Sequence, residues 1–140
     1  MGKKTKSICN CINMRRAANA VTDYYDRILK PSGLTVGQFT LLKNINWLGH
    51  PCSVSELAEC SNLERTTVAR NLKPLFNVGL IEDISKPNGR TRQLRVTAAG
   101  LEALETALPL WKTAQQGFKE NIGTENLNIF NNLIYKLENI

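Results

Sequence analysis

The stretch VSELAECSNLERTTVARNLKPLFNVGLI, residues 54–81, decides how this chain folds. It contains two helical patterns separated by the short polar segment CSN. The first pattern follows Ser53, which with Glu56 has the spacing of a capping box that starts a helix. In the second pattern, apolar residues repeat at i, i+4 and i+7 from Val68 to Leu75 and share one face. Two short helices joined by a tight turn indicate a helix-turn-helix.

The opposite face of the second helix is basic and hydroxylated, because Thr66, Arg70 and Lys73 lie on it. Two segments with strand composition follow, LIEDIS (80–85) and RQLRVT (92–97). The loop between them, SKPNGRTR, combines a Pro-Asn-Gly turn with three basic residues and no acidic one. A helix fits the major groove of DNA, and a thin basic loop fits the minor groove. The pattern therefore predicts a winged helix-turn-helix that contacts DNA.

Helical periodicity continues on both sides of this motif. The turn KPSG (30–33) ends the first helix, and the long helix after the wing contains Pro109. The expected flanking helices span residues 7–30, 36–48, 98–122 and 125–140.

The first and last helices carry apolar residues that a small winged helix cannot bury by itself. A second copy of the chain could cover them. We therefore predict a mainly α fold with a small β-hairpin wing, a winged helix-turn-helix with N- and C-terminal dimerisation helices. Residues 34–99 are expected to form the DNA-binding domain, and residues 1–33 and 100–140 the helical dimerisation region.

The composition favours an anionic partner and offers no catalytic site. The 140 residues carry a net charge of +6 and have a pI of about 9.3, which favours nucleic acid. No apolar run approaches the ~20 residues that span a bilayer, and no signal-peptide core follows the basic N-terminus, so we expect a cytoplasmic protein. The sequence has no Ser/His/Asp set and no phosphate loop. We therefore predict a binding protein that is not an enzyme.

The cysteines Cys9, Cys11, Cys52 and Cys60 are expected to be free thiols, because disulfide frameworks belong to secreted proteins. Cys60 fits a half-buried helix position, and Cys52 fits a loop just before a helix cap. The single histidine, His50, lies close to Cys52, but no CxxC or HxxxH spacing supports a metal site. We expect neither a metal nor a cofactor.

Three segments together resemble the MarR family of bacterial and archaeal transcriptional regulators: LTVGQFTLL (34–42), the deciding stretch 54–81, and NGRTRQLRVTAAG (88–100). The resemblance implies a dimer that binds double-stranded DNA, with intertwined terminal helices and the fourth helix in the major groove. It places the wing-tip arginine at Arg90, although Asn88 stands where the family usually has the aspartate that orients this arginine. The same loop contributes Arg92. The DNA-contacting residues of the helix would be Arg65, Thr66, Thr67, Arg70 and Lys73.

The expected function is a transcriptional regulator that acts as a repressor. A two-fold dimer predicts a roughly palindromic operator with half-sites about one DNA turn apart. The resemblance implies release from DNA by a small aromatic or anionic effector bound between the dimer helices and the winged domain. Trp47, Tyr24, Arg15 and Arg16 could line such a pocket.

Two alternatives remain open at this point. One branch of the family senses organic peroxides through a cysteine on the first helix, held by tyrosines of the partner subunit. Cys11 falls at about that cysteine's position and Tyr25 at one tyrosine, whereas Val36 replaces the second tyrosine. The other alternative is a winged helix whose basic face binds an acidic protein instead of DNA.

Overall fold

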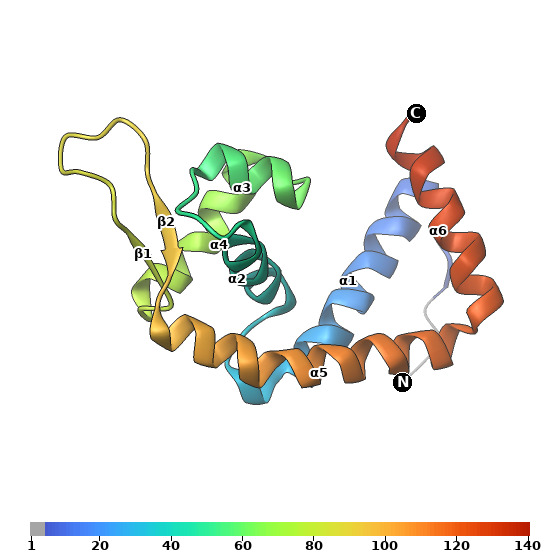
Figure 1. Ribbon diagram of the computed structural model, residues 1–140. Helices are drawn as coiled ribbons and strands as arrows, with labels where there is room; N and C mark the ends of the chain where they lie inside the picture. Colours follow the sequence, from blue (N-terminus) through green and yellow to red (C-terminus); the bar gives the residue numbers. More distant parts are fainter. Residues whose placement is uncertain (1–4) are drawn as a thin grey trace.

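The computed structural model describes residues 5–140, which form a winged helical domain with two projecting helical arms (Figure 1). The chain is mainly helical, and its two short strands form one antiparallel hairpin. This confirms the predicted fold class. The elements are α1 (Asn10–Leu29), the 3₁₀ turn η1 (Lys30–Ser32), α2 (Val36–Leu48), α3 (Val54–Ser61), α4 (Arg65–Asn77), β1 (Ile81–Asp83), β2 (Leu94–Val96), α5 (Ala98–Ile122) and α6 (Thr124–Glu138).

The helix starts follow local capping chemistry. Ser53 caps α3 by accepting from the backbone N–H of Glu56, and the Glu56 carboxylate accepts from the Ser53 N–H, which is the predicted capping box. Thr35 and Gln38 form a second capping box at α2. The first helix begins later than residue 7, because the Asn13 side chain bonds both the N–H and the carbonyl of Ser7 and holds this segment outside the helix.

Helix α4 buries the apolar face that its sequence pattern predicted. Val68, Leu72 and Leu75 are fully buried or nearly so, and they pack with α2, α3 and the hairpin into one core. Pro74 lies inside the helix, and the chain leaves helical geometry three residues later, after Asn77. Gly79 then adopts a left-handed φ of 74°, as expected of a glycine that follows a helix C-terminus.

The hairpin is joined to the core by a third extended segment. β1 and β2 pair with Ile81 opposite Val96, and Cys52 pairs with Leu94 through two backbone hydrogen bonds of 3.0 and 2.7 Å. The predicted loop position of Cys52 before a helix cap is therefore also a fully buried core position. The expectation of a half-buried Cys60 was wrong, since this thiol is exposed. Cys60 lies about 200° around the helix axis from the core residue Ala58 and about 60° from Leu57, on the side of Leu57 away from Ala58, so it lies beyond the edge of the buried face.

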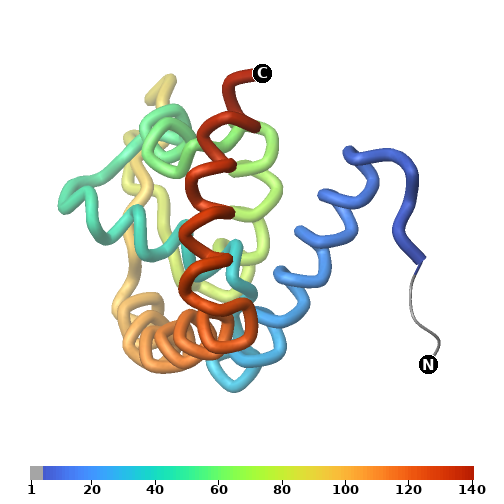
Figure 2. Tube along the Cα trace, turned by 90° about the vertical axis from the view of Figure 1, so that its right-hand side faces the viewer, coloured from blue at the N-terminus to red at the C-terminus, as the bar shows by residue number. Residues whose placement is uncertain are grey.

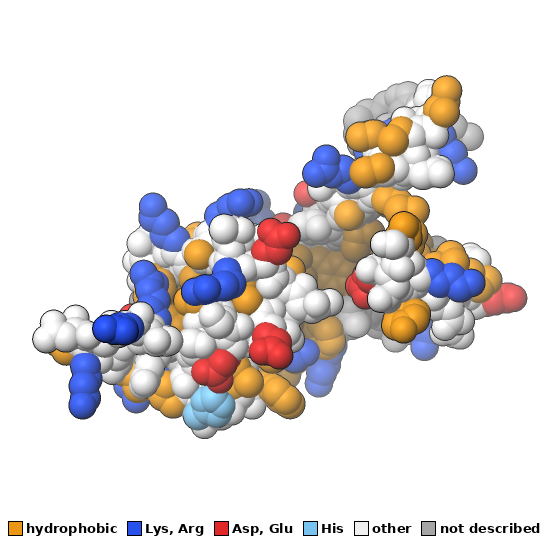
Figure 3. All heavy atoms as spheres, turned by 90° about the horizontal axis from the view of Figure 1, so that it is seen from above, with side chains coloured by type: hydrophobic (Ala, Val, Ile, Leu, Met, Phe, Trp, Pro, Cys, Tyr) orange, Lys and Arg blue, Asp and Glu red, His pale blue; other side chains and the backbone are white. Residues whose placement is uncertain are grey.

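Helices α1, α5 and α6 extend beyond the winged domain. α5 runs from the hairpin beneath that domain, and α1 and α6 rise from it as two separate arms (Figure 2). Tyr24 and Tyr25 of α1 pack against α5, where Gly117 leaves room for the Tyr24 ring. By contrast, α6 has no buried residue in the structure of residues 5–140. Apolar side chains consequently remain exposed along both arms (Figure 3).

Candidate nucleic-acid interface

The exposed face of α4 presents most of the predicted DNA-contacting side chains together. Arg65, Thr66, Arg70 and Lys73 are exposed, as required if Val68 and its apolar neighbours face the core. Thr67 lies at the edge of this face, is half-buried, and its carbonyl accepts a hydrogen bond of 3.0 Å from the Asn71 side chain. The structure therefore places four of the five predicted helix residues in solvent and the fifth at the boundary with the core.

The wing ends in the tight turn that the sequence predicted. The Gly89 N–H donates to the Lys86 carbonyl at 2.8 Å, which closes the turn around Pro87 and Asn88. Arg90 follows directly and is exposed, and its guanidinium has no hydrogen-bond or ion-pair partner within residues 5–140. A cationic side chain at the tip of a thin hairpin is thus free to meet an anion.

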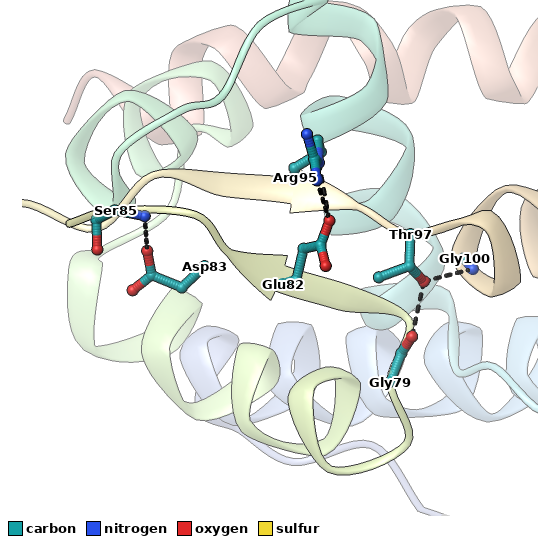
Figure 4. Close-up of polar contacts among 7 residues, drawn as sticks. All are labelled: Gly79, Glu82, Asp83, Ser85, Arg95, Thr97 and Gly100. Carbon is teal, nitrogen blue, oxygen red and sulfur yellow. Dashed lines mark hydrogen bonds and ion pairs between the residues drawn. The ribbon is translucent and has the colours of Figure 1, made fainter. Parts of the chain in front are cut away.

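Asp83 organises the base of the wing. One of its carboxylate oxygens accepts the Ser85 N–H at 2.9 Å (Figure 4) and the Gln93 N–H at 3.1 Å, so it connects the two sides of the hairpin. Hydrogen bonds from Ser85 hold the pKa of the Asp83 carboxyl below its usual value, and the Gln93 amide and the nearby Arg92 charge act in the same direction. Asp83 is therefore an ionised brace at neutral pH.

The root of the hairpin is fixed by further polar contacts. Arg95 of β2 forms an exposed ion pair with Glu82 of β1, with the Arg95 Nε 2.9 Å from a Glu82 carboxylate oxygen. The Thr97 hydroxyl donates to the Gly79 carbonyl at 2.7 Å and accepts the Gly100 N–H at 3.1 Å (Figure 4). These bonds tie the end of α4, the hairpin and the start of α5 together at one point.

An open hollow of about 1060 Å³ lies between α4, the start of α3 and the wing. The predicted residues Arg65, Thr66 and Lys73 line it from the helix, and Arg90 and Arg92 line it from the wing. Arg70 and Thr67 lie outside it. Basic side chains also gather over the wing and the adjoining part of the winged domain (Figure 3). The remaining lining residues are Ser53, Val54, Ser55, Ala69, Leu72, Phe76, Asp83 and Thr91.

Two of the residues that line this hollow, Phe76 and Asp83, make contacts with the wing and were not predicted as functional residues. Phe76 lies under the Arg92 guanidinium, whose central carbon is 5.2 Å from the ring centroid, and Asp83 braces the wing beside it. In the sequence, Asp83 lay within the predicted strand segment 80–85, and no pattern marked it as a functional residue. Nothing in the sequence pairs Arg92 with Phe76, because sixteen residues and a change of secondary structure separate them.

The proposed redox pair does not meet within one chain. Cys11 is exposed at the start of α1, and Tyr25 is buried fourteen residues further along the same helix, which separates them by about 21 Å at 1.5 Å per residue. The Tyr25 hydroxyl donates to the Gln115 side chain of α5. Burial raises the pKa of Tyr25, and the neighbouring Tyr24 adds to this effect. Only Tyr25 of a second copy could approach Cys11.

The four residues expected to line an effector pocket do not meet in the single chain. Trp47 is 75% exposed at the end of α2, whereas the Tyr24 hydroxyl lies 3.4 Å from the Ala114 carbonyl of α5. Arg16 donates to the Thr5 carbonyl at 2.7 Å, and Arg15 is exposed. None of them lines the hollow beside α4 or the smaller one of about 200 Å³ near His50.

In residues 5–140, no three His, Cys, Asp or Glu side chains gather as they would around a metal ion. No helix within the same residues combines the length and apolarity needed to cross a bilayer.

Comparison with known proteins defines the class to which this fold and basic surface belong. Residues 34–100 match the family model of a winged helix DNA-binding domain. The M. tuberculosis transcriptional regulator MosR, in its crystal structure with DNA, is 36% identical to this chain. The match covers 93% of this chain and 96% of MosR, with a TM-score of 0.76. No curated protein sequence matched the chain.

More distant structures share the fold over the whole length. Bordetella bronchiseptica BpsR, described with 6-hydroxynicotinic acid, is 19% identical with a TM-score of 0.81, and the match covers 99% of this chain and 100% of BpsR. Streptomyces coelicolor PcaV, in complex with its natural ligand, is 20% identical with a TM-score of 0.79, and the match covers 99% of this chain and 98% of PcaV. The chain is thus a winged-helix DNA-binding transcriptional regulator. It belongs to the MarR family, as its sequence motifs predicted.

Proposed function

We propose that this protein is a homodimeric repressor that binds a roughly palindromic operator and leaves it when a small molecule binds. The observation that carries the DNA-binding part is the shared hollow, where Arg65, Thr66 and Lys73 of α4 face the same space as Arg90 and Arg92 of the wing. Cations on both sides of an open hollow suit a charged duplex backbone, and the exposed helix face suits the major groove.

The proposed dimer rests on the apolar side chains that the single chain leaves in solvent. On α6, Phe130 and Leu133 are 49% and 46% exposed, and on α1 Ile12 and Met14 are 43% and 50% exposed. Exposed apolar groups at helical spacing on two arms suit burial against a second copy. In this proposal, residues 34–99 form the DNA-binding domain, and residues 1–33 and 100–140 form the dimerisation region.

The oligomeric state can be tested separately. Replacing Leu133 by Lys would place a charge in the proposed α6 interface, and sedimentation velocity is expected to change from dimer to monomer. Lys in place of Glu138, near the end of the same helix, is the matched control and is expected to remain dimeric. A Leu133→Lys protein that stays dimeric would contradict the use of this face.

Release by a ligand is supported by the ligand-bound forms of related structures. BpsR is described with 6-hydroxynicotinic acid, and PcaV with its natural ligand. A dimer joined through α1 and α6 would couple a molecule bound near these helices to the distance between the two copies of α4. A small aromatic or anionic effector is the expected class.

The decisive experiment compares two duplexes of equal length, the DNA upstream of the protein's own gene and a scrambled version. Binding of the reduced protein is measured by fluorescence anisotropy across a salt series. A specific complex is expected, with a steep log–log salt dependence of about 0.9 for each phosphate neutralised. Equal and weak binding to both duplexes would contradict the proposal, and would favour a winged helix that binds an acidic protein.

A thiol-based sensor is the second candidate, and the exposed positions of Cys9 and Cys11 on the α1 arm favour it. A thiolate must reach its oxidant, so exposure is the first requirement. In the same anisotropy assay, a stoichiometric organic hydroperoxide would then release the operator from the reduced protein. If the hydroperoxide does not change operator binding, the thiol-based sensor is excluded and release by a small-molecule ligand remains.

A further inference from the structure

We propose that Arg92, Phe76 and Asp83 form a clasp that sets the position of the wing over α4, so that Arg92 acts as a positioning residue and Arg90 as the DNA contact. This inference rests on the proposed function, in which the wing and α4 bind one duplex. It assigns a role to Phe76 and Asp83 that neither the motif nor the basic charge pattern indicates.

The first part of the clasp joins the wing to the helix. The Arg92 guanidinium carbon lies 5.2 Å from the centroid of the Phe76 ring, within the range of a cation–π contact. Phe76 is half-buried and packs against the core, so its ring is a fixed surface. Arg92 therefore connects the wing to the packed interior of the domain.

The second part of the clasp fixes the hairpin at its base. The Asp83 carboxylate accepts the Ser85 and Gln93 amides, one from each side of the wing (Figure 4 shows the Ser85 contact). Gln93 precedes β2 and directly follows Arg92. The Asp83 brace thus controls the backbone that carries Arg92, and it places a negative charge near the Arg92 guanidinium.

Little else holds the wing in place. On the tip side of the paired strands, the only backbone hydrogen bond across the hairpin within residues 5–140 runs from Ile84 N–H to the Gln93 carbonyl, at 2.9 Å. The turn closed by Gly89 is internal to the tip and does not touch α4. Arg90 lies between that turn and Arg92, and its side chain has no hydrogen-bond or ion-pair partner among the described residues 5–140. Its position over the hollow consequently depends on the clasp.

This arrangement predicts that replacing the uncharged residue Phe76 changes the affinity of the protein for DNA. Replacing Phe76 by Leu keeps an apolar side chain and every charge, but removes the ring face on which Arg92 rests. We expect operator affinity to fall about tenfold. Because Arg90 would disengage, the log–log salt slope would decrease by about 0.9 for each lost phosphate contact, or about 1.8 for a dimer. Phe76→Tyr retains the ring face and is expected to bind as the wild type does.

A double-mutant cycle with Arg90→Ala separates positioning from direct contact. If the clasp acts through Arg90, adding Phe76→Leu or Asp83→Asn to Arg90→Ala produces little further loss. Additive losses, or an unchanged affinity in Phe76→Leu, would overturn the clasp. If Phe76→Leu does not fold, Arg92→Gln takes its place in the cycle with the same two outcomes.

A DNA-free readout keeps this inference distinct from the proposed function. In the full-length protein without DNA, brief trypsin treatment followed by mass spectrometry measures cleavage after Arg90. We expect cleavage to be several-fold faster in Phe76→Leu and Asp83→Asn than in the wild type and Phe76→Tyr, because the wing is released. Equal cleavage rates would overturn the clasp even if the wild type binds its operator. A wild type that binds no duplex, with faster cleavage in the variants, would overturn only the proposed function.

Discussion

Gly100 offers the sharpest test of how the winged domain is joined to α5. This residue is buried in the first turn of α5, and a Cβ atom added to it would lie 2.1 Å from the Leu80 carbonyl oxygen and 2.6 Å from the Val96 Cγ1. Real Cβ contacts essentially never fall below 3.0 Å, so Gly100→Ala requires the helix and the strand root to separate by about 1 Å.

The cost of that separation can be worked from its parts. Helix propensity alone would favour alanine by about 1 kcal/mol. Overpacking against backbone costs about 1–3 kcal/mol. The displaced Leu80 carbonyl also accepts the Thr97 N–H at 3.0 Å, and weakening that hydrogen bond costs about 1 kcal/mol. We therefore expect Gly100→Ala to lower the free energy of unfolding by about 2 kcal/mol.

Gly37 supplies the matched control, because it is also a helical glycine. Its added Cβ would meet no atom closer than 3.9 Å, and its φ is not positive. Gly37→Ala is consequently expected to be neutral or to raise the free energy of unfolding by up to about 1 kcal/mol. Opposite signs at two helical glycines would exclude propensity as the explanation.

Urea denaturation followed by circular dichroism measures both changes. The variants must be compared at equal protomer concentration, because the stability of a dimer depends on it. The m-values should match that of the wild type, so that the midpoints report stability. If Gly100→Ala proves as stable as the wild type, the close approach of α5 to the Leu80 carbonyl is not rigid, and the reasoning fails.

The remaining predictions concern DNA contact and the thiols. Arg90→Ala is expected to weaken operator binding at least tenfold, and the control Lys112→Ala on α5 is expected to leave it unchanged. If an anisotropy titration finds wild-type affinity for Arg90→Ala, the wing tip does not contribute to DNA binding. If Cys11 is the sensor, the Cys11→Ser variant is expected to stay bound to operator DNA when organic hydroperoxide is added. If the hydroperoxide still releases this variant from the DNA, Cys11 is excluded as the sensor. Cys9, Cys11 and Cys60 are expected to react with a thiol reagent in the native protein, and Cys52 only in denaturant, as a time course of labelling would reveal. Because burial raises the pKa of the Cys52 thiol to about 11, the folded state holds this proton more tightly than the unfolded chain. That contribution to stability is complete below the unfolded value of about 8.5 and is lost as the pH rises towards the folded value, so Cys52→Ala should flatten the alkaline part of a stability curve.

Much of the fold could be predicted because its signals are local. The Ser53–Glu56 capping box, the apolar repeat through Val68 and the Pro-Asn-Gly turn each act within a few residues, so the sequence locates α3, α4 and the wing. The same repeat also indicates which side of α4 faces solvent. The exposure of Arg65, Thr66, Arg70 and Lys73 follows from it directly.

Contacts between distant segments required the tertiary structure. Cys52 is a buried partner of Leu94 because three extended segments meet there, and no local pattern at Cys52 signals that pairing. Cys60 is exposed because so short a helix has only one side against the core. Tyr25 is held by Gln115 of α5, ninety residues away, and no local pattern signals that contact.

The sequence alone determined the order of the helices, the hairpin, the basic face and the family, because periodicity, capping and turn chemistry are properties of neighbouring residues. The tertiary structure decided which basic side chains line the hollow between α4 and the wing. Arg90 and Arg92 are two residues apart in the loop, yet only Arg92 of the two contacts Phe76 within the part of the chain that the structure describes, and this depends on where the packing of α4 places one aromatic ring.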